Sequence, residues 1–278
     1  MKGGYILLNG KFHPEKEPLI AGLGCNHLGT VIKESFRTEN NEILFPNENY
    51  LYILDHLAAF ETPIPKDWDL VRLRKDVSRL LNKNHLFLAA RVTILFFKGD
   101  KDTSYLLTAE EIPRGFYPLN ETGLLIDFYE EGNKGDTPFN SFESSSRFLW
   151  RSSLLTADKK GKQNLLISNS KEFICEGIGV SFGYWAENNL ILPSKEANGY
   201  YPPLVEIIAE NAKENGFEVR LKSNISKDDL LNADEVFLID NCLGIQKVLG
   251  LNNRRYYSTK TALLSSMMKE HASQSLQL

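Results

Sequence analysis

Three charged residues in this chain have types and settings that could take part in chemistry. Glu176 precedes Gly177 at an apolar turn, where a carboxylate could bind a cation or cap the turn. Glu143 lies in a serine-rich segment and could act as a general base, or could be a loop carboxylate facing solvent. Arg91 lies within the apolar run 87–97 and could bind a substrate carboxylate, for which guanidinium geometry is suited, or pair with a neighbouring acid.

The cysteines point to a reducing compartment and not to a metal site. Cys25 and His27 together offer too few ligands for zinc, so no metal is expected. Cys25, Cys175 and Cys242 are far apart in the sequence, and an odd, sparse count fits reduced thiols. We therefore expect a cytoplasmic protein.

The composition is that of an ordinary globular protein. The chain has 278 residues, of which 42% are hydrophobic and 24% charged, and its net charge is −4. That balance gives no electrostatic case for binding nucleic acid or an anionic membrane. No apolar run reaches the roughly 18 residues of a membrane span, and the apolar run at the start is too short for a signal peptide.

Hydrophobic periodicity and turn residues predict the elements that must position these side chains. In the first half we expect a hairpin at 5–12, a strand pair at 29–45, helices at 48–60 and 67–83 with Asp67 as N-cap of the second, and a strand at 87–97. Prolines and a glycine at 110–120 predict a linker. We expect an N-terminal domain at 1–112, a linker at 113–121 and a C-terminal domain at 122–278.

The second half mixes strands and helices without a strict alternation. The predicted elements are a strand at 123–129, a loop at 130–146, a helix at 147–160, strands at 165–168 and within 173–193, a helix at 202–215, a strand at 217–220, a capped helix from Ser226, a strand at 235–239 and a helix at 258–271. Both halves together predict an α+β fold with two domains.

Residues 173–193 resemble the E-G-x-x-x-N-[IL]-F segment of the class IV aminotransferase family. That family comprises fold-type IV pyridoxal phosphate (PLP) enzymes such as branched-chain and D-amino-acid aminotransferases and aminodeoxychorismate lyase. Further fragments follow the family's order at 6–12, 29–37, 54–57, 90–94, 232–237 and 244–248. The resemblance implies an N-terminal α/β sandwich, a C-terminal barrel-like α+β domain, a homodimer, PLP between the domains, and an amino or keto acid-like ligand.

The same resemblance assigns cofactor positions. It places Glu176 against the pyridine nitrogen of PLP and puts Ser181 where the family has an asparagine. The family's Schiff-base lysine precedes that glutamate by about 33 residues, and the residue there is Glu143. A carboxylate cannot form the imine that PLP chemistry needs.

Two further cofactor contacts differ from the family pattern. Tyr52 stands where the family often has an arginine for the cofactor phosphate. Residues 202–205 replace the G-I-T-R phosphate cup, and Pro202 and Pro203 lack the backbone N–H groups that such a cup uses. We expect the tyrosines at 200–201 to pack into the former phosphate site.

These departures leave three possibilities open. The chain could be an aminotransferase or lyase by descent with impaired or altered activity, Arg91 and Tyr52 being its substrate-binding candidates. It could instead be a non-catalytic small-molecule-binding or dimeric scaffold protein on the same fold. A working lysine could also remain elsewhere: Lys33 borders the family's active site, and Lys134 lies in a glycine-flanked loop that predicts a solvated turn.

Overall fold

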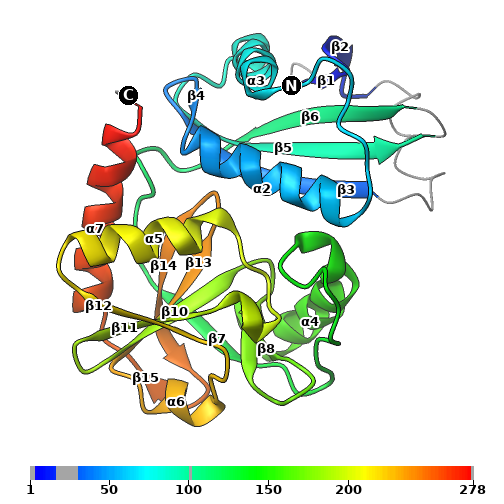
Figure 1. The fold of residues 1–278 in the computed structure, drawn as a ribbon. Coiled ribbons are helices and arrows are strands. Elements are labelled where there is room, and N and C mark those ends of the chain that lie inside the picture. The colour runs from blue at the N-terminus through cyan, green and yellow to red at the C-terminus, as the bar shows by residue number, and fades with distance from the viewer. Residues whose placement is uncertain (1–3, 17–30, 100–101, 277–278) are drawn as a thin grey trace. The chain divides into compact units, whose positions relative to one another are not determined.

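The structure is a computed structural model that describes residues 4–16, 31–99 and 102–276 (Figure 1). Cys25 and His27 lie outside the described residues. The chain divides into two compact units, Met1–Gly115 with Ser275–Leu278, and Phe116–Gln274. The division lies within the linker predicted at 113–121. No helix in the described ranges is both long and apolar enough to cross a membrane.

The first unit is an antiparallel sheet packed against two helices. Its strands follow the order β2-β1-β6-β5-β3-β4. The elements are β1 (Tyr5–Leu8), β2 (Lys11–Pro14), β3 (Val31–Glu39), β4 (Glu42–Ile43), α2 (Pro46–Ala59), α3 (Leu70–Asn84), β5 (Ala89–Lys98) and β6 (Thr103–Glu111). Figure 1 shows α2 beside strand β3.

Turn chemistry explains the hairpins of this unit. Asn9 and Gly10 have φ angles of 48° and 79°, and Asn40 and Asn41 have 51° and 68°. Two successive residues in the left-handed region are typical of the tight turns that match the twist of paired strands. Both predicted hairpins are therefore present, although residues 29–30 of the second lie outside the described part.

Two details of this unit differ from expectation. The N-cap of α3 is Asp69, whose carboxylate accepts a hydrogen bond from the Arg72 amide at 2.7 Å. Asp67, the predicted cap, has a φ of 56° and precedes the helix in a turn. The sequence interpretation also missed β6, which pairs along the whole length of β5.

The second unit is built on one large mixed sheet. Its strands follow the order β12-β11-β10-β13-β14-β7-β8-β9, with β15 beside β14. The elements are β7 (Leu124–Phe128), the 3-10 turn η1 (Glu143–Ser145), α4 (Arg147–Lys160), β8 (Asn164–Ser168), β9 (Ile174–Gly177), β10 (Ser181–Ala186), β11 (Asn189–Pro193), η2 (Lys195–Ala197), α5 (Pro203–Glu214), β12 (Glu218–Lys222), α6 (Lys227–Leu231), β13 (Glu235–Asp240), β14 (Gly244–Leu251), β15 (Arg254–Arg255) and α7 (Thr259–Gln274).

The two edges of this sheet curl toward each other. The edge strand β9 forms an antiparallel bridge to Ile225, just beyond β12 at the opposite edge, and the Ile174 amide donates to the Ile225 carbonyl at 2.7 Å. A second bridge joins Gly177 to Val180 at the start of β10. The resulting barrel-like sheet confirms the predicted α+β class and places Glu176 of β9 inside a closed wall.

Candidate functional site

The Glu176 carboxylate is the centre of the most chemically distinctive cluster in the second unit. Its side chain is fully buried. One oxygen, Oε1, accepts a hydrogen bond from Trp150 Nε1 at 2.9 Å. The other, Oε2, accepts from Lys134 Nζ at 2.5 Å, from the Tyr200 amide at 2.6 Å and from Ser146 Oγ at 3.4 Å. Four donors from three other segments therefore converge on this one carboxylate.

Lys134 provides the only charged donor among these four. It is 3% exposed, so the expectation of a solvated turn is wrong. Its backbone amide donates to the Ser168 carbonyl at 2.8 Å, which fixes the loop against the end of β8. Its ammonium also donates to the Asn140 carbonyl at 2.7 Å. The lysine side chain therefore points into the unit, where its positive charge stabilises the buried carboxylate of Glu176.

Close backbone packing brings the Tyr200 amide to the same carboxylate. A Cβ on Gly199 would lie 1.9 Å from the Cys175 carbonyl oxygen, so this approach to β9 requires glycine. The Tyr200 ring packs edge-on against Trp150 with 5.2 Å between ring centroids. Burial, together with the charge of Glu176, raises the pKa of the Cys175 thiol, which therefore stays protonated beside the cluster.

Glu143 is held at the start of the helix that contributes two of the donors. It begins η1, and its side chain is 13% exposed. The alternative of a loop carboxylate facing solvent is therefore wrong. Its Oε1 forms an ion pair with Arg147 Nε at 3.5 Å, one turn along the chain. Glu143 is thus a carboxylate paired with a guanidinium.

The N-terminus of α5, which the sequence resemblance assigned to the phosphate cup, has its first backbone donors removed or used. Pro202 and Pro203 have no N–H group. The Leu204 amide donates to Asn241 Oδ1 at 3.4 Å, and the Val205 amide to the Pro202 carbonyl at 3.0 Å. The tyrosines at 200–201 are buried beside this turn, as predicted.

The other sequence candidates are distributed over both units. Ser181 begins β10 and is fully buried, and its Oγ has no hydrogen-bond partner within the part of the chain that the structure describes. Lys33 on β3 and Tyr52 on α2 are half-buried side chains of the first unit. Arg91 on β5, also in the first unit, pairs with Glu110 at 2.9 Å, which is the acid pairing considered from the sequence.

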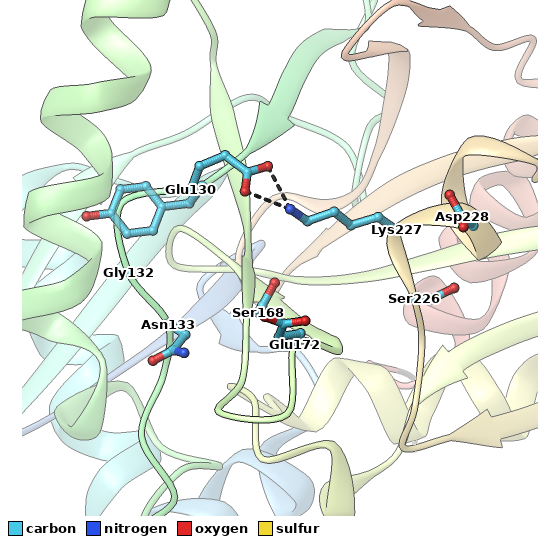
Figure 2. A pocket seen from close by; sticks show the side chains of 9 residues that line it. Glu130, Gly132, Asn133, Ser168, Glu172, Ser226, Lys227 and Asp228 are labelled. Atoms are coloured by element: carbon cyan, nitrogen blue, oxygen red, sulfur yellow. Dashed lines mark hydrogen bonds and ion pairs between the residues drawn. The ribbon is translucent and has the colours of Figure 1, made fainter.

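A separate polar pocket of about 470 Å³ opens on the second unit (Figure 2). An ion pair spans it, with Lys227 Nζ at 2.7 Å from both carboxylate oxygens of Glu130. The rest of its lining is Tyr129, Gly132, Asn133, Ser168, Glu172, Ser226 and Asp228. Across the described ranges there is no group of three or more histidine, cysteine or acidic residues that could hold a metal.

Several of the residues in the Glu176 cluster escaped the sequence interpretation. Trp150 and Ser146 were not identified as donors to Glu176, nor Asn140 as the acceptor of Lys134. Trp150 lies in a helix that was predicted correctly, and its spacing of three and seven residues from Ser153 and Ala157 puts it on the buried side. A buried indole N–H usually finds an acceptor, so a tryptophan on the apolar side of a helix is a signal that could have suggested a contact with the buried acid.

The fold places the chain in the fold-type IV class. The similar solved structures include several branched-chain aminotransferases. That from the archaeon Thermoproteus uzoniensis, with norvaline, has a TM-score of 0.83 at 15% identity and covers 98% of this chain and 96% of its own. The Escherichia coli enzyme has a TM-score of 0.80 at 20% identity and covers 95% and 93%. The Thermobaculum terrenum enzyme in its PLP form has a TM-score of 0.81 at 15% identity and covers 98% and 95%.

The family model for amino-transferase class IV matches residues 32–251, which is most of the chain. The chain therefore belongs to the class IV aminotransferase family, as its sequence motifs suggested. No curated protein matches it.

The residues at the corresponding positions do not fit the PLP that this family implies. A PLP ring nitrogen would need an acceptor position on Glu176, and the donors from Lys134, Trp150, Ser146 and Tyr200 already use that carboxylate. A PLP phosphate would need donors at the start of α5, where two are missing and the next two are used.

Proposed function

We propose that this class IV aminotransferase-family protein does not perform the Schiff-base chemistry of its relatives. Glu143 carries the proposal, because the sequence resemblance assigns it to the position of the family's lysine and its carboxylate forms an ion pair with Arg147. Transamination on PLP begins with an imine between the cofactor aldehyde and a neutral amine. A carboxylate has no nitrogen with which to form it.

Of the two remaining lysine candidates, Lys134 supplies that amine poorly. Lys134 is bound to Glu176 and to the Asn140 carbonyl, and an ammonium in an ion pair is not a nucleophile. Lys33, on β3 of the first unit, is the substitute that the resemblance suggested and is the lysine that a direct test must address.

The test is visible absorption of the purified protein with PLP, followed by borohydride reduction and peptide mapping. The expected result is no stable internal-aldimine band and no phosphopyridoxyl tag. A stoichiometric band with a single tag on Lys33 or Lys134 would overturn the proposal and restore an aminotransferase or lyase assignment. Tags scattered at low yield over exposed lysines such as Lys195, which is 59% exposed, represent non-specific reaction.

A second candidate function is non-catalytic binding of a small molecule, and the pocket beside α6 favours it (Figure 2). Glu130, Glu172 and Asp228 oppose the single cation Lys227, so the lining carries an excess of negative charge. Hydroxyl and amide groups complete the wall. Such a lining suits a polar amine and disfavours the anionic keto acids that transaminases handle.

A thermal-shift screen of hydrophilic amines tests this candidate. An amine that fits raises the melting temperature of the wild-type protein and raises that of Glu172→Gln less, because the substitution removes one carboxylate of the lining. An equal shift in both proteins would assign the effect to another site. A homodimer, which the family resemblance implies, is part of the same proposal, and light scattering on the eluting protein would test it.

A further inference from the structure

We infer that Lys134 replaces the cofactor's ring nitrogen at Glu176, so that a side chain of this protein closes the cofactor site from within. The inference deepens the proposed function and rests on it, because a chain without a Schiff-base lysine gains nothing from a ring nitrogen at this carboxylate. Glu176 then acts as a structural anchor and not as a cofactor ligand.

The hydrogen-bonding capacity of Glu176 is the first argument. A carboxylate offers about four lone-pair sites for hydrogen bonds. Lys134, Tyr200 and Ser146 all donate to Oε2, and Trp150 donates to Oε1, so Oε2 is fully used and Oε1 keeps one site at most. A pyridinium N–H could reach Oε2 only by displacing one of these donors.

Charge identifies the donor that a pyridinium would have to displace. A fully buried carboxylate is costly without a cation, and Lys134 is its ion-pair partner, with side chains 3% and 0% exposed. A protonated pyridine carries the same charge as the ammonium, so both together would leave an excess cation in a dry site. The two groups therefore exclude each other.

The geometry of PLP also excludes an arrangement in which Lys134 bonds to Glu176 and forms the imine with the cofactor at the same time. The aldehyde that forms an imine lies para to the ring nitrogen. An amine bonded to the acid that would hold the nitrogen is consequently at the wrong end of the ring to react with the aldehyde. Lys134 thus cannot be the missing Schiff-base lysine while it occupies Glu176.

The loop around Lys134 has the contacts of a built site. The ammonium donates to both Glu176 and the Asn140 carbonyl, and Asn140 Nδ2 donates back to the Gly135 carbonyl at 2.8 Å. Thr137 Oγ1 donates to Asn140 Oδ1 at 2.9 Å. These bonds hold the loop in the conformation that delivers the lysine.

Shortening the lysine should convert this internal contact into a binding site for a small cation. In Lys134→Ala we expect a lowered melting temperature that ethylammonium chloride raises again in a concentration-dependent manner, because the added cation takes the vacated place. Sodium chloride at equal concentration should not do so. The matched control is Lys160→Ala, whose lysine pairs with Asp127 at 3.2 Å, is 38% exposed and lies outside the pocket beside α6; this variant should show neither effect.

Ethylammonium that stabilises Lys134→Ala no more than sodium does, or no more than it stabilises the control, would overturn the inference. A Lys134→Ala protein with the melting temperature of wild type would do the same.

A measurement on the wild-type protein covers the case in which the variant does not fold. Limited acetylation followed by peptide mapping should label Lys134 at least about tenfold more slowly than Lys227, because a buried, ion-paired amine reacts only through local opening. Equal rates would overturn the inference.

The two tests separate this inference from the proposed function. A reactive Lys134 in a protein that forms no PLP imine removes the inference and leaves the proposed function standing. An imine at Lys33 in a protein whose Lys134 stays protected removes the proposed function and leaves Lys134 at Glu176.

Discussion

Replacing Lys134 by methionine should destabilise the second unit strongly. The substitution keeps most of the side-chain volume and removes the charge, so Glu176 would stay buried with three neutral donors and no cation. Removing one partner of a buried ion pair costs about 3–5 kcal/mol. For a unit of this size that lowers the melting temperature by about 6–20 °C, at roughly 2–4 °C per kcal/mol.

A double-mutant cycle isolates the ion pair within that loss. Glu176→Gln alone strands a buried ammonium, so it should also be costly, whereas Lys134→Met combined with Glu176→Gln should lose less than either single variant. Urea unfolding followed by tryptophan fluorescence gives the free energies. A Trp68→Phe background restricts the signal to Trp150 and Trp185, which both lie in the second unit.

Lys227→Met provides the scale for an exposed pair. Its side chain is 38% exposed and that of Glu130 is 60% exposed, so the loss should not exceed about 1 kcal/mol. Additive effects of the Lys134 and Glu176 substitutions, or a Lys134→Met loss as small as that of the surface control, would refute the reasoning.

Three further substitutions test other parts of the structure. Gly199→Ala should lower the free energy of unfolding in urea by about 1–3 kcal/mol or more through overpacking, because its Cβ would meet the Cys175 carbonyl at 1.9 Å; an unchanged free energy would contradict the close approach. Burial, and then the bond to Asp76, raises the pKa of Tyr105 to about 12, so its contribution to stability is complete below pH 10 and is lost as the pH rises toward 12. In Tyr105→Phe that alkaline loss should shrink in urea unfolding curves at increasing pH, and an identical pH profile would argue against it. Ser226→Ala removes the N-cap of α6 and should cost about 1 kcal/mol by the same urea assay, with no loss if the capping box is unimportant.

The local elements of this fold are readable from the sequence because their signals are local. The pair Asn9-Gly10 specifies a hairpin through its backbone preferences, and Ser226 with Asp229 forms the expected capping box. The helix predicted at 147–160 is α4 with those bounds. The strand β6 was missed because no element was assigned to residues 103–109, and the last two residues of the strand were included in the linker predicted from the prolines and glycine at 110–120.

The candidate site was less predictable, since its contacts join residues distant in sequence. Glu176 was identified from its motif, but Lys134 lies 42 residues before it, in a loop whose composition is that of a solvated turn. The composition of such a loop predicts only that loops of this kind are usually exposed to solvent. It does not report that a buried carboxylate nearby requires a cation, which is a tertiary constraint.

The burial of the tyrosines at 200–201 could be predicted because its signals are local in the sequence. The two prolines restrict the backbone φ angles, and the two aromatic rings gain free energy from burial, so these preferences can be read from the residue types alone. The Tyr200 amide was nevertheless not foreseen as a donor to Glu176, because that bond depends on the close passage of Gly199 past Cys175.

A crystal structure of the protein grown with excess PLP would test the central claim most directly. Our account predicts Lys134 Nζ within hydrogen-bonding distance of Glu176 and no cofactor ring at that carboxylate. A pyridine ring nitrogen against Glu176, with Lys134 displaced into solvent or joined to the aldehyde carbon, would contradict it.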